Sequence, residues 1–222
     1  MESIFSASEP SLGYLYQLRY GLMLILSEKN EDSKLLLEQL DDISIETPSS
    51  ISVYQTKLHI NSVANLTNAS TDLWKTIRVW SEAIKTGTLD PDNDSFNLIT
   101  TATASVDSIP YKIKQGSHAT RNVEEIIFEL INVATTSVSV TNKAAYAAFL
   151  NLDSEQQKKL IKKITVIDAS IDINAAKEMI LHEIRHYSIN KEALYERLEG
   201  WFMGQAILQL QGIRDAIIAK EV

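Results

Sequence analysis

The chain has 222 residues, a formal net charge of −8 and no cysteine. This length allows one large domain or a core with a helical appendage. The 45% hydrophobic content is enough for a sizeable core. A chain without cysteine has no disulfide framework and no thiolate metal site. The acidic balance counts against a protein that grips nucleic acid over its whole surface, so such a role needs a local basic patch or partner subunits.

The N-terminal residues 1–13 lack the basic and apolar regions of a signal peptide. The longest apolar run, residues 21–26, is far shorter than the roughly 20 residues that span a bilayer. We therefore expect a soluble, cytoplasmic protein without a membrane partner.

Hydrophobic periodicity predicts helices and strands in a mixed order along the chain. In chain order, the expected elements are a helix to about residue 27, strands at 34–38, 43–45 and around 55–57, a helix at 70–87, a strand at 96–104, a loop at 110–120, a helix at 123–131, helices at 146–150 and 157–163, a strand at 164–168, and helices at 173–187 and 192–219. This order is typical of an α/β core. Trp74 and Trp80 are expected to pack in the core.

The expected hairpin carries the most informative polar residues. Asp42 opens its first strand, and Gln55 and Lys57 point the same way on its second strand because side chains alternate faces. If the two strands pair, a carboxylate, an amide and a lysine converge at one edge of a sheet. Oxygen ligands suit Mg²⁺, and a cation beside them positions a phosphate and water. Glu38 and Asp41 are further candidate carboxylates.

These residues occur in an order that resembles the PD-(D/E)xK nuclease superfamily. The order is G-x-x-Y-Q ending at Gln17, then Asp42, then Q-x-K from Gln55 to Lys57. It is most similar to the branch in which Gln replaces the acid of the third motif, as in Mrr-like restriction endonucleases. The segments GYLYQLRYGL, LLLEQLDDI, YQTK and STDLWKTIRVW resemble the double-strand DNA endonuclease domain of bacterial anti-phage effectors. That domain heads CBASS effectors and also occurs beside HerA-type ATPases and in ABC-three-component systems.

The resemblance covers roughly residues 10–105 and implies a restriction-endonuclease-like α/β fold, with a mixed sheet core flanked by helices. We expect the nuclease core in residues 1–145 and a mainly helical C-terminal region in 146–222, for assembly or as a link to a further domain. The implied activity is double-strand DNA cleavage with Mg²⁺ or Mn²⁺. The implied partners are double-stranded DNA, further copies of the chain, and a defence-system ATPase or sensor.

Carried over to this sequence, the resemblance implies Asp42 and Gln55 as metal ligands and Lys57 as the catalytic lysine, with Glu38 or Asp41 as added ligands. Mrr-like enzymes often have Glu in the first helix where this chain has Gln17. Two neutral amides therefore stand where acids occur in relatives. The alternative is a catalytically weak or inactive nuclease-fold module for assembly or nucleic-acid binding.

Two further groups of residues are candidates. The loop cations Lys112, Lys114 and Arg121 are candidate DNA contacts. The sequence His182-Glu183-x-x-His186 matches the H-E-x-x-H zinc motif and makes a zinc hydrolase the remote alternative. The periodicity of this helix places both histidines opposite its apolar stripe, where a buried metal site is not expected.

Overall fold

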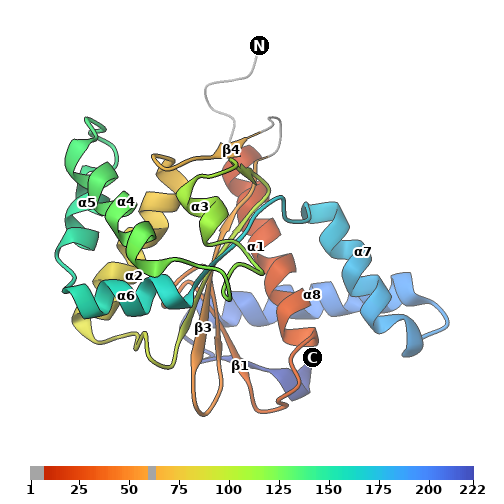
Figure 1. The fold of residues 1–222 in the computed structure, drawn as a ribbon. Coiled ribbons are helices and arrows are strands. Elements are labelled where there is room, and N and C mark those ends of the chain that lie inside the picture. The colour runs from red at the N-terminus through yellow and green to blue at the C-terminus, as the bar shows by residue number, and fades with distance from the viewer. Residues whose placement is uncertain (1–7, 60–63) are drawn as a thin grey trace. The chain divides into compact units, whose positions relative to one another are not determined.

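The computed structural model describes residues 8–59 and 64–222, and its fold is α/β (Figure 1). The chain forms two compact units. The first comprises residues up to 49 together with 171–222, and the second comprises residues 50–170. We expected two consecutive parts, residues 1–145 and 146–222. In the structure, the first unit combines two separate stretches of the sequence. Within the described part of the chain, no helix combines the length and apolarity needed to cross a bilayer.

The first unit combines antiparallel strands with three long helices. Its elements are α1 (Ser8–Leu26), β1 (Lys34–Leu37), β2 (Ile43–Glu46), α7 (Ile173–Glu183), η1 (Ile184–His186), α8 (Lys191–Leu210), β8 (Ile217–Ile218) and η2 (Ala219–Glu221). Strand β1 pairs with β2 on one side and with β8 on the other. Helices α1 and α7 lie side by side (Figure 1).

Buried polar contacts connect the C-terminal part of the first unit to its N-terminal part. The Tyr16 hydroxyl donates to the Ile171 carbonyl oxygen at 2.9 Å. Gln209 of α8 lies against the edge of β1, where its Oε1 accepts from the Leu37 N–H at 3.2 Å and its Nε2 donates to the Leu35 carbonyl oxygen at 3.3 Å. The amide thus satisfies edge groups that would otherwise be buried without partners.

Two expectations for this unit are wrong in extent. The last helix was expected to reach residue 219, but α8 ends at Leu210. Gly212 then adopts φ 70°, and residues 217–218 form strand β8. A left-handed glycine after a helix ends it by redirecting the chain. The helix expected over 173–187 ends at Glu183 and continues as a 3₁₀ turn.

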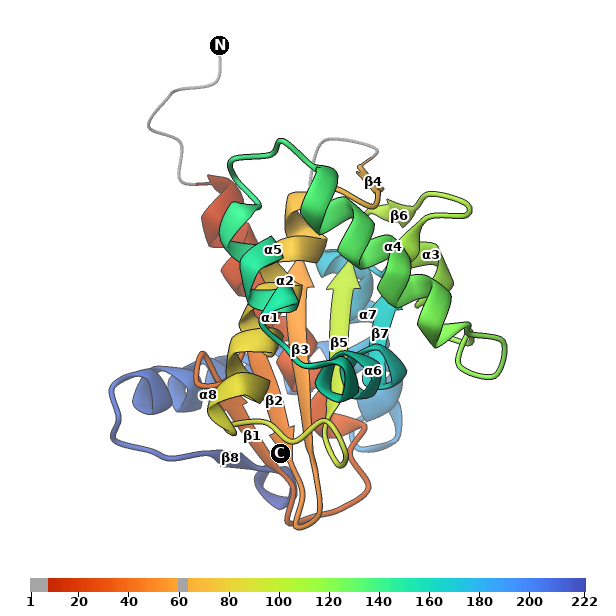
Figure 2. The same cartoon turned by 60° about the vertical axis from the view of Figure 1, so that its left-hand side comes forward.

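The second unit is built on parallel strands. Its elements are β3 (Ile51–Lys57), β4 (Asn65–Leu66), α2 (Thr71–Thr86), β5 (Ser95–Thr100), β6 (Thr103–Ala104), α3 (Ile109–Lys112), α4 (Val123–Thr136), α5 (Lys143–Leu150), α6 (Ser154–Lys163) and β7 (Ile164–Ile167). Strand β5 lies between β3 and β7 and is parallel to both, as Figure 2 shows. Strands β4 and β6 form a separate parallel pair.

Apolar runs account for the core of the second unit. Phe96, Leu98 and Ile99 of β5 are fully buried, as expected for a parallel strand covered on both faces. Trp74 and Trp80 of α2 are also fully buried, which confirms their predicted packing role. The strand expected over 96–104 stops at Thr100, and the loop expected at 110–120 begins inside helix α3.

Candidate functional site

The main chain of Asp42 is held by contacts from three directions within the first unit. The Gln17 side-chain Nε2, on α1, donates to the Asp42 carbonyl oxygen at 2.5 Å. The Glu38 N–H donates to the same oxygen at 3.2 Å, across the turn between β1 and β2. Asp41 Oδ1 accepts from the Asp42 N–H at 3.1 Å. Asp42 is therefore fixed at the start of β2, and its residue is partly exposed.

Gln17 is almost fully buried, at 4% exposure. Its amide nitrogen is used on a main-chain carbonyl oxygen 25 residues further along the chain. The structure therefore brings the first and second predicted motifs together, and it gives Gln17 the role of a structural donor.

Glu38 occupies the turn beside this contact in an uncommon backbone conformation. Its φ is 55°, a left-handed value that costs a non-glycine residue free energy. Burial and the nearby Glu38 charge raise the pKa of the Tyr14 hydroxyl. Across residues 8–59 and 64–222, no three or more His, Cys, Asp or Glu side chains are grouped to hold a metal ion, so Glu38, Asp41 and Asp42 do not form such a group.

Gln55 and Lys57 lie on β3 in the second unit, and the predicted strand is confirmed. They pair in register with Leu98 and Thr100 of β5, and the spacing of two residues gives them the same face. Gln55 is buried and Lys57 is partly exposed. Because Asp42 belongs to the other unit, its convergence with Gln55 and Lys57 stays a prediction.

Sequence reasoning did not single out a polar contact just beyond Lys57. His59 Nε2 lies 3.0 Å from Asp72 Oδ2, in the first turn of α2. The His59 N–H donates to Thr101 Oγ1 at 2.8 Å, just after β5. These groups lie where two parallel strands end, the edge at which open α/β sheets commonly bind ligands. The signal in the sequence was that His59 follows Lys57 by two residues and so continues the alternation of side chains along the strand.

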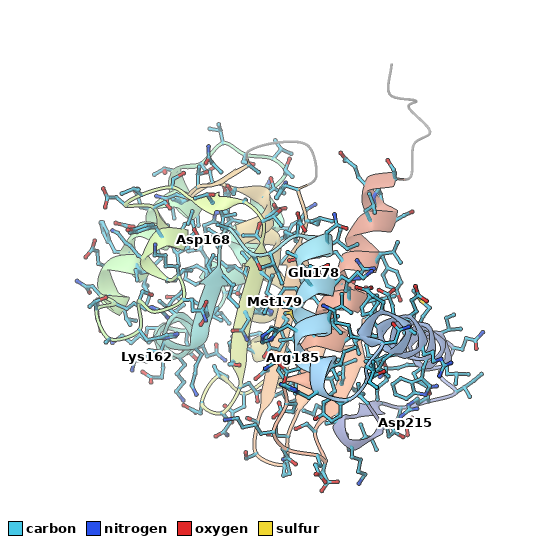
Figure 3. The ribbon with its side chains drawn as sticks, turned by 90° about the vertical axis from the view of Figure 1, so that its right-hand side faces the viewer. Lys162, Asp168, Glu178, Met179, Arg185 and Asp215 are labelled. Atoms are coloured by element: carbon cyan, nitrogen blue, oxygen red, sulfur yellow. The ribbon has the colours of Figure 1, made fainter. Side chains whose placement is uncertain are left out.

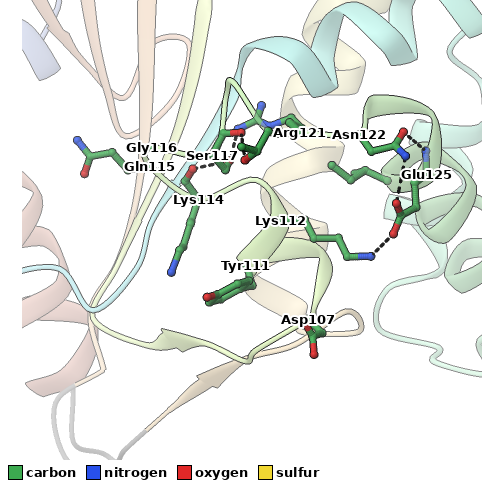
Figure 4. Close-up of a pocket in the computed structure, with 12 residues that line it drawn as sticks. Asp107, Tyr111, Lys112, Lys114, Gln115, Gly116, Ser117, Arg121, Asn122 and Glu125 are labelled. Atoms are coloured by element: carbon green, nitrogen blue, oxygen red, sulfur yellow. Dashed lines mark hydrogen bonds and ion pairs between the residues drawn. The ribbon is translucent and has the colours of Figure 1, made fainter.

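The loop cations line a hollow of about 540 Å³ in the second unit (Figure 4). Lys112 Nζ forms ion pairs with Glu125 at 2.6 Å and with Glu129 at 2.5 Å. Lys114 Nζ lies 3.8 Å from the centre of the Tyr111 ring, and no ion pair joins it to a carboxylate among the residues described. Of the two lysines, Lys114 is therefore the better placed to meet an added anion.

Arg121 has a structural role in the same hollow. Its guanidinium donates to the carbonyl oxygens of Ile161, Ile164 and Ile113 at 2.7, 2.9 and 3.2 Å. Burial lowers its pKa. These bonds fasten the loop to the start of β7, so both terminal nitrogens of the guanidinium are already engaged within the protein. Contact of Lys112, Lys114 and Arg121 with DNA stays a prediction.

The H-E-x-x-H residues do not form a zinc site in this structure. Helix α7 ends at Glu183, so the motif does not lie on one continuous helix. His182 and His186 are both exposed, while Ile184 is buried. His182 Nδ1 lies 3.0 Å from the guanidinium of Arg185. The absence of a metal-holding group along the described chain includes these residues.

Comparisons with known proteins point to one kind of structure. No family model matches the chain, and no curated protein matches it in sequence. A solved structure of the Cap4 SAVED/CARF-domain-containing receptor from Moraxella osloensis matches with a TM-score of 0.53 and 16% identity, covering 88% of this chain and 43% of that chain. The Acinetobacter baumannii Cap4 receptor with the cyclic trinucleotide 2'3'3'-cAAA matches with a TM-score of 0.49 and 16% identity, covering 92% and 42%. The likeness to the Moraxella receptor shows a shared fold, and this chain spans less than half the length of both receptors.

Proposed function

We propose that this chain is a metal-dependent double-strand DNA endonuclease module of a bacterial anti-phage effector. The observation that carries the proposal is the hydrogen bond from Gln17 to Asp42, because it joins two motifs of the nuclease resemblance. The third motif, Gln55-Thr56-Lys57, lies on a strand as that resemblance requires. The fold likeness to a Cap4 receptor adds support, because a match to 43% of that chain suits one module of a longer effector.

Each proposed residue has a chemical task at the scissile phosphate. A bound Mg²⁺ or Mn²⁺ would activate water and neutralise developing charge on the phosphate. The Asp42 carboxylate would hold this ion, with the Gln55 side-chain oxygen as a neutral second ligand and Glu38 or Asp41 as a further carboxylate. The Lys57 ammonium would orient the attacking water and stabilise the transition-state charge.

Metal-dependent cleavage of supercoiled plasmid tests this proposal. The wild-type chain is expected to linearise plasmid with Mg²⁺ or Mn²⁺ and to stop when EDTA removes the ion. The variant Asp42→Asn is expected to lose about 100-fold or more in rate. Asp215→Asn is the matched control, because Asp215 is exposed and lies outside both the proposed site and the hollow of the loop cations. Equal cleavage by wild type and Asp42→Asn would contradict the assignment.

A second candidate is a nuclease-fold module that assembles or binds nucleic acid without cutting it. The observation in its favour is that the Gln17 amide is spent on a main-chain oxygen and the nearby acids form no metal-holding group among the described residues. A purified chain that binds DNA but shows no metal-dependent cleavage in any oligomeric state would favour this candidate.

Control of the activity is part of the proposal. An effector nuclease must be restrained in its host, so we expect cleavage to require self-association or a partner such as an ATPase or a sensor. The net charge of −8 is consistent with this requirement, because an acidic chain gains little from non-specific attraction to DNA.

A further inference from the structure

The first unit has two adjoining hollows along α1 and α7 that share Leu26 and Glu183. The larger, of about 370 Å³, is lined in part by α8 and the 3₁₀ turn after α7. The smaller, of about 240 Å³, lies between the end of α1 and α7. We call them together the α1–α7 groove. Its apolar lining includes Ile25, Leu26, Met179, Ile184, Leu194 and Leu198.

Large apolar side chains stay exposed along this groove. Tyr187, which lines the larger hollow, is 82% exposed, and Met179 of the smaller hollow is 49% exposed. Figure 3 shows Glu178 and Met179 on α7 and Arg185 in the 3₁₀ turn that follows it. An apolar surface with a polar rim is typical of a protein interaction site.

The charged residues of the groove lining have one sign. Glu28, Glu31, Glu178 and Glu183 line the two hollows, and neither lining includes a lysine or arginine among the described residues. None of the four glutamates forms an ion pair within residues 8–59 and 64–222. Two cations lie near the lining. Arg185 contacts His182, which lines the smaller hollow, and Lys220 pairs with Asp32 at 2.7 Å while its charge also interacts with Glu31.

We propose that the α1–α7 groove is a docking site for a basic amphipathic helix of a partner protein. Apolar side chains spaced by three or four residues would fill the floor, as in other helix-in-groove complexes. Lysine or arginine on the flanks of that helix would meet the four glutamates. Charge complementarity therefore favours a basic partner over an acidic one. The same glutamates repel DNA and anionic lipid. None of the groove residues is a proposed nuclease residue, so this proposal stands apart from the catalytic one.

Selection from a random peptide library on the full chain tests the proposal. The double variant Glu31→Lys/Glu183→Lys serves for counter-selection, so that retained peptides depend on the groove charge. The enriched peptides are expected to be rich in lysine or arginine, with apolar residues at helical spacing. Enrichment of acidic peptides would overturn the proposal. So would a selection in which every enriched peptide binds the wild type and the double variant equally.

A binding measurement with one selected peptide separates groove contacts from general attraction. Fluorescence anisotropy is expected to show at least about tenfold weaker binding to the double variant. Leu198→Ala is also expected to weaken binding, because it removes part of the apolar floor. Glu196→Lys is the matched control, since Glu196 is exposed on α8 but lines neither hollow, and it should leave the affinity unchanged.

The alternative occupant is a second copy of the chain. Sedimentation velocity of the wild type and of the double variant distinguishes it, with thermal melts confirming that both are folded. A wild-type dimer that the double variant abolishes would assign the groove to self-association and contradict a separate basic partner.

Discussion

In the proposed nuclease resemblance, Gln17 takes the position of a first-helix acid, and in the structure it donates to the carbonyl oxygen of Asp42. A carboxylate has no proton to donate, so Gln17→Glu should leave this part-buried contact without its side-chain donor. We expect the free energy of unfolding to fall by about 1–3 kcal/mol, measured by urea denaturation. Gln211→Glu, an exposed change, is the control. A variant that is equally stable and cleaves faster would instead mark position 17 as a metal ligand.

Glu125 offers a test of pH dependence at a single side chain. The hydrogen bond and the charge of Lys112 lower the pKa of Glu125. Its stabilising contribution is therefore present above the ordinary Glu pKa and is lost as the pH falls through the folded-state pKa. Glu125→Gln should reduce the loss of Tm on acidification, measured by circular dichroism from about pH 6 to about pH 3. If the Tm of Glu125→Gln falls on acidification by as much as that of the wild type, the pair with Lys112 adds no stability.

These residue contacts mark a limit of what sequence alone reveals. The motif spacing predicted the strand that carries Gln55 and Lys57, and Gln17 does contact Asp42, whereas the convergence of Asp42 with that strand stays a prediction. Formal charge did not show that Lys112 is engaged by two glutamates 13 and 17 residues away, or that Arg121 is used on main-chain oxygens. The pairing of His59 with Asp72 likewise joins residues from a strand end and a helix start, which no local pattern encodes.

Helix α2 is fixed to the second unit by aromatic packing around Trp74. The Trp74 ring meets Tyr146 edge-on with centroids 4.6 Å apart, and Trp74 Nε1 donates to the Asn68 carbonyl oxygen at 2.7 Å. Trp74→Ala should cost about 3–5 kcal/mol in unfolding free energy because it leaves a cavity. Trp74→Phe should cost less, since it keeps a ring but loses the donor. A denaturant melt that ranks the two variants in the opposite order would contradict this packing role.

At the scale of elements, periodicity predicted most helices and strands and failed where distant contacts decide. The apolar spacing continues past residue 210, so it extended the last helix through Gly212. Residues 217–218 are a strand because they pair with Lys34 and Leu35 of β1, which lie 184 and 182 residues away in sequence. The β-branched run over residues 96–104 likewise predicts one continuous strand. In the structure β5 ends at Thr100, and β6 pairs with β4 instead of continuing β5.

For the whole molecule, the C-terminal part completes the first unit. Strand β8 pairs with β1, and Arg19 of α1 donates to the Ile173 carbonyl oxygen at 2.8 Å and pairs with Glu199 of α8 at 2.7 Å. Residues 171–222 are therefore part of a folded core, and removing them would unfold the unit that holds Asp42. Tests of partner binding are better made with point changes in the α1–α7 groove.

The account depends most on Lys57, the one cation of the proposed nuclease motif. The most direct measurement is the rate of Mg²⁺-dependent plasmid cleavage by wild type, Lys57→Ala and Lys75→Ala, run on each oligomeric fraction. Lys75 is an exposed lysine on α2 and serves as the control. We predict that Lys57→Ala keeps its fold and loses cleavage, while Lys75→Ala cleaves like the wild type. Cleavage by a folded Lys57→Ala variant at the wild-type rate would contradict the account.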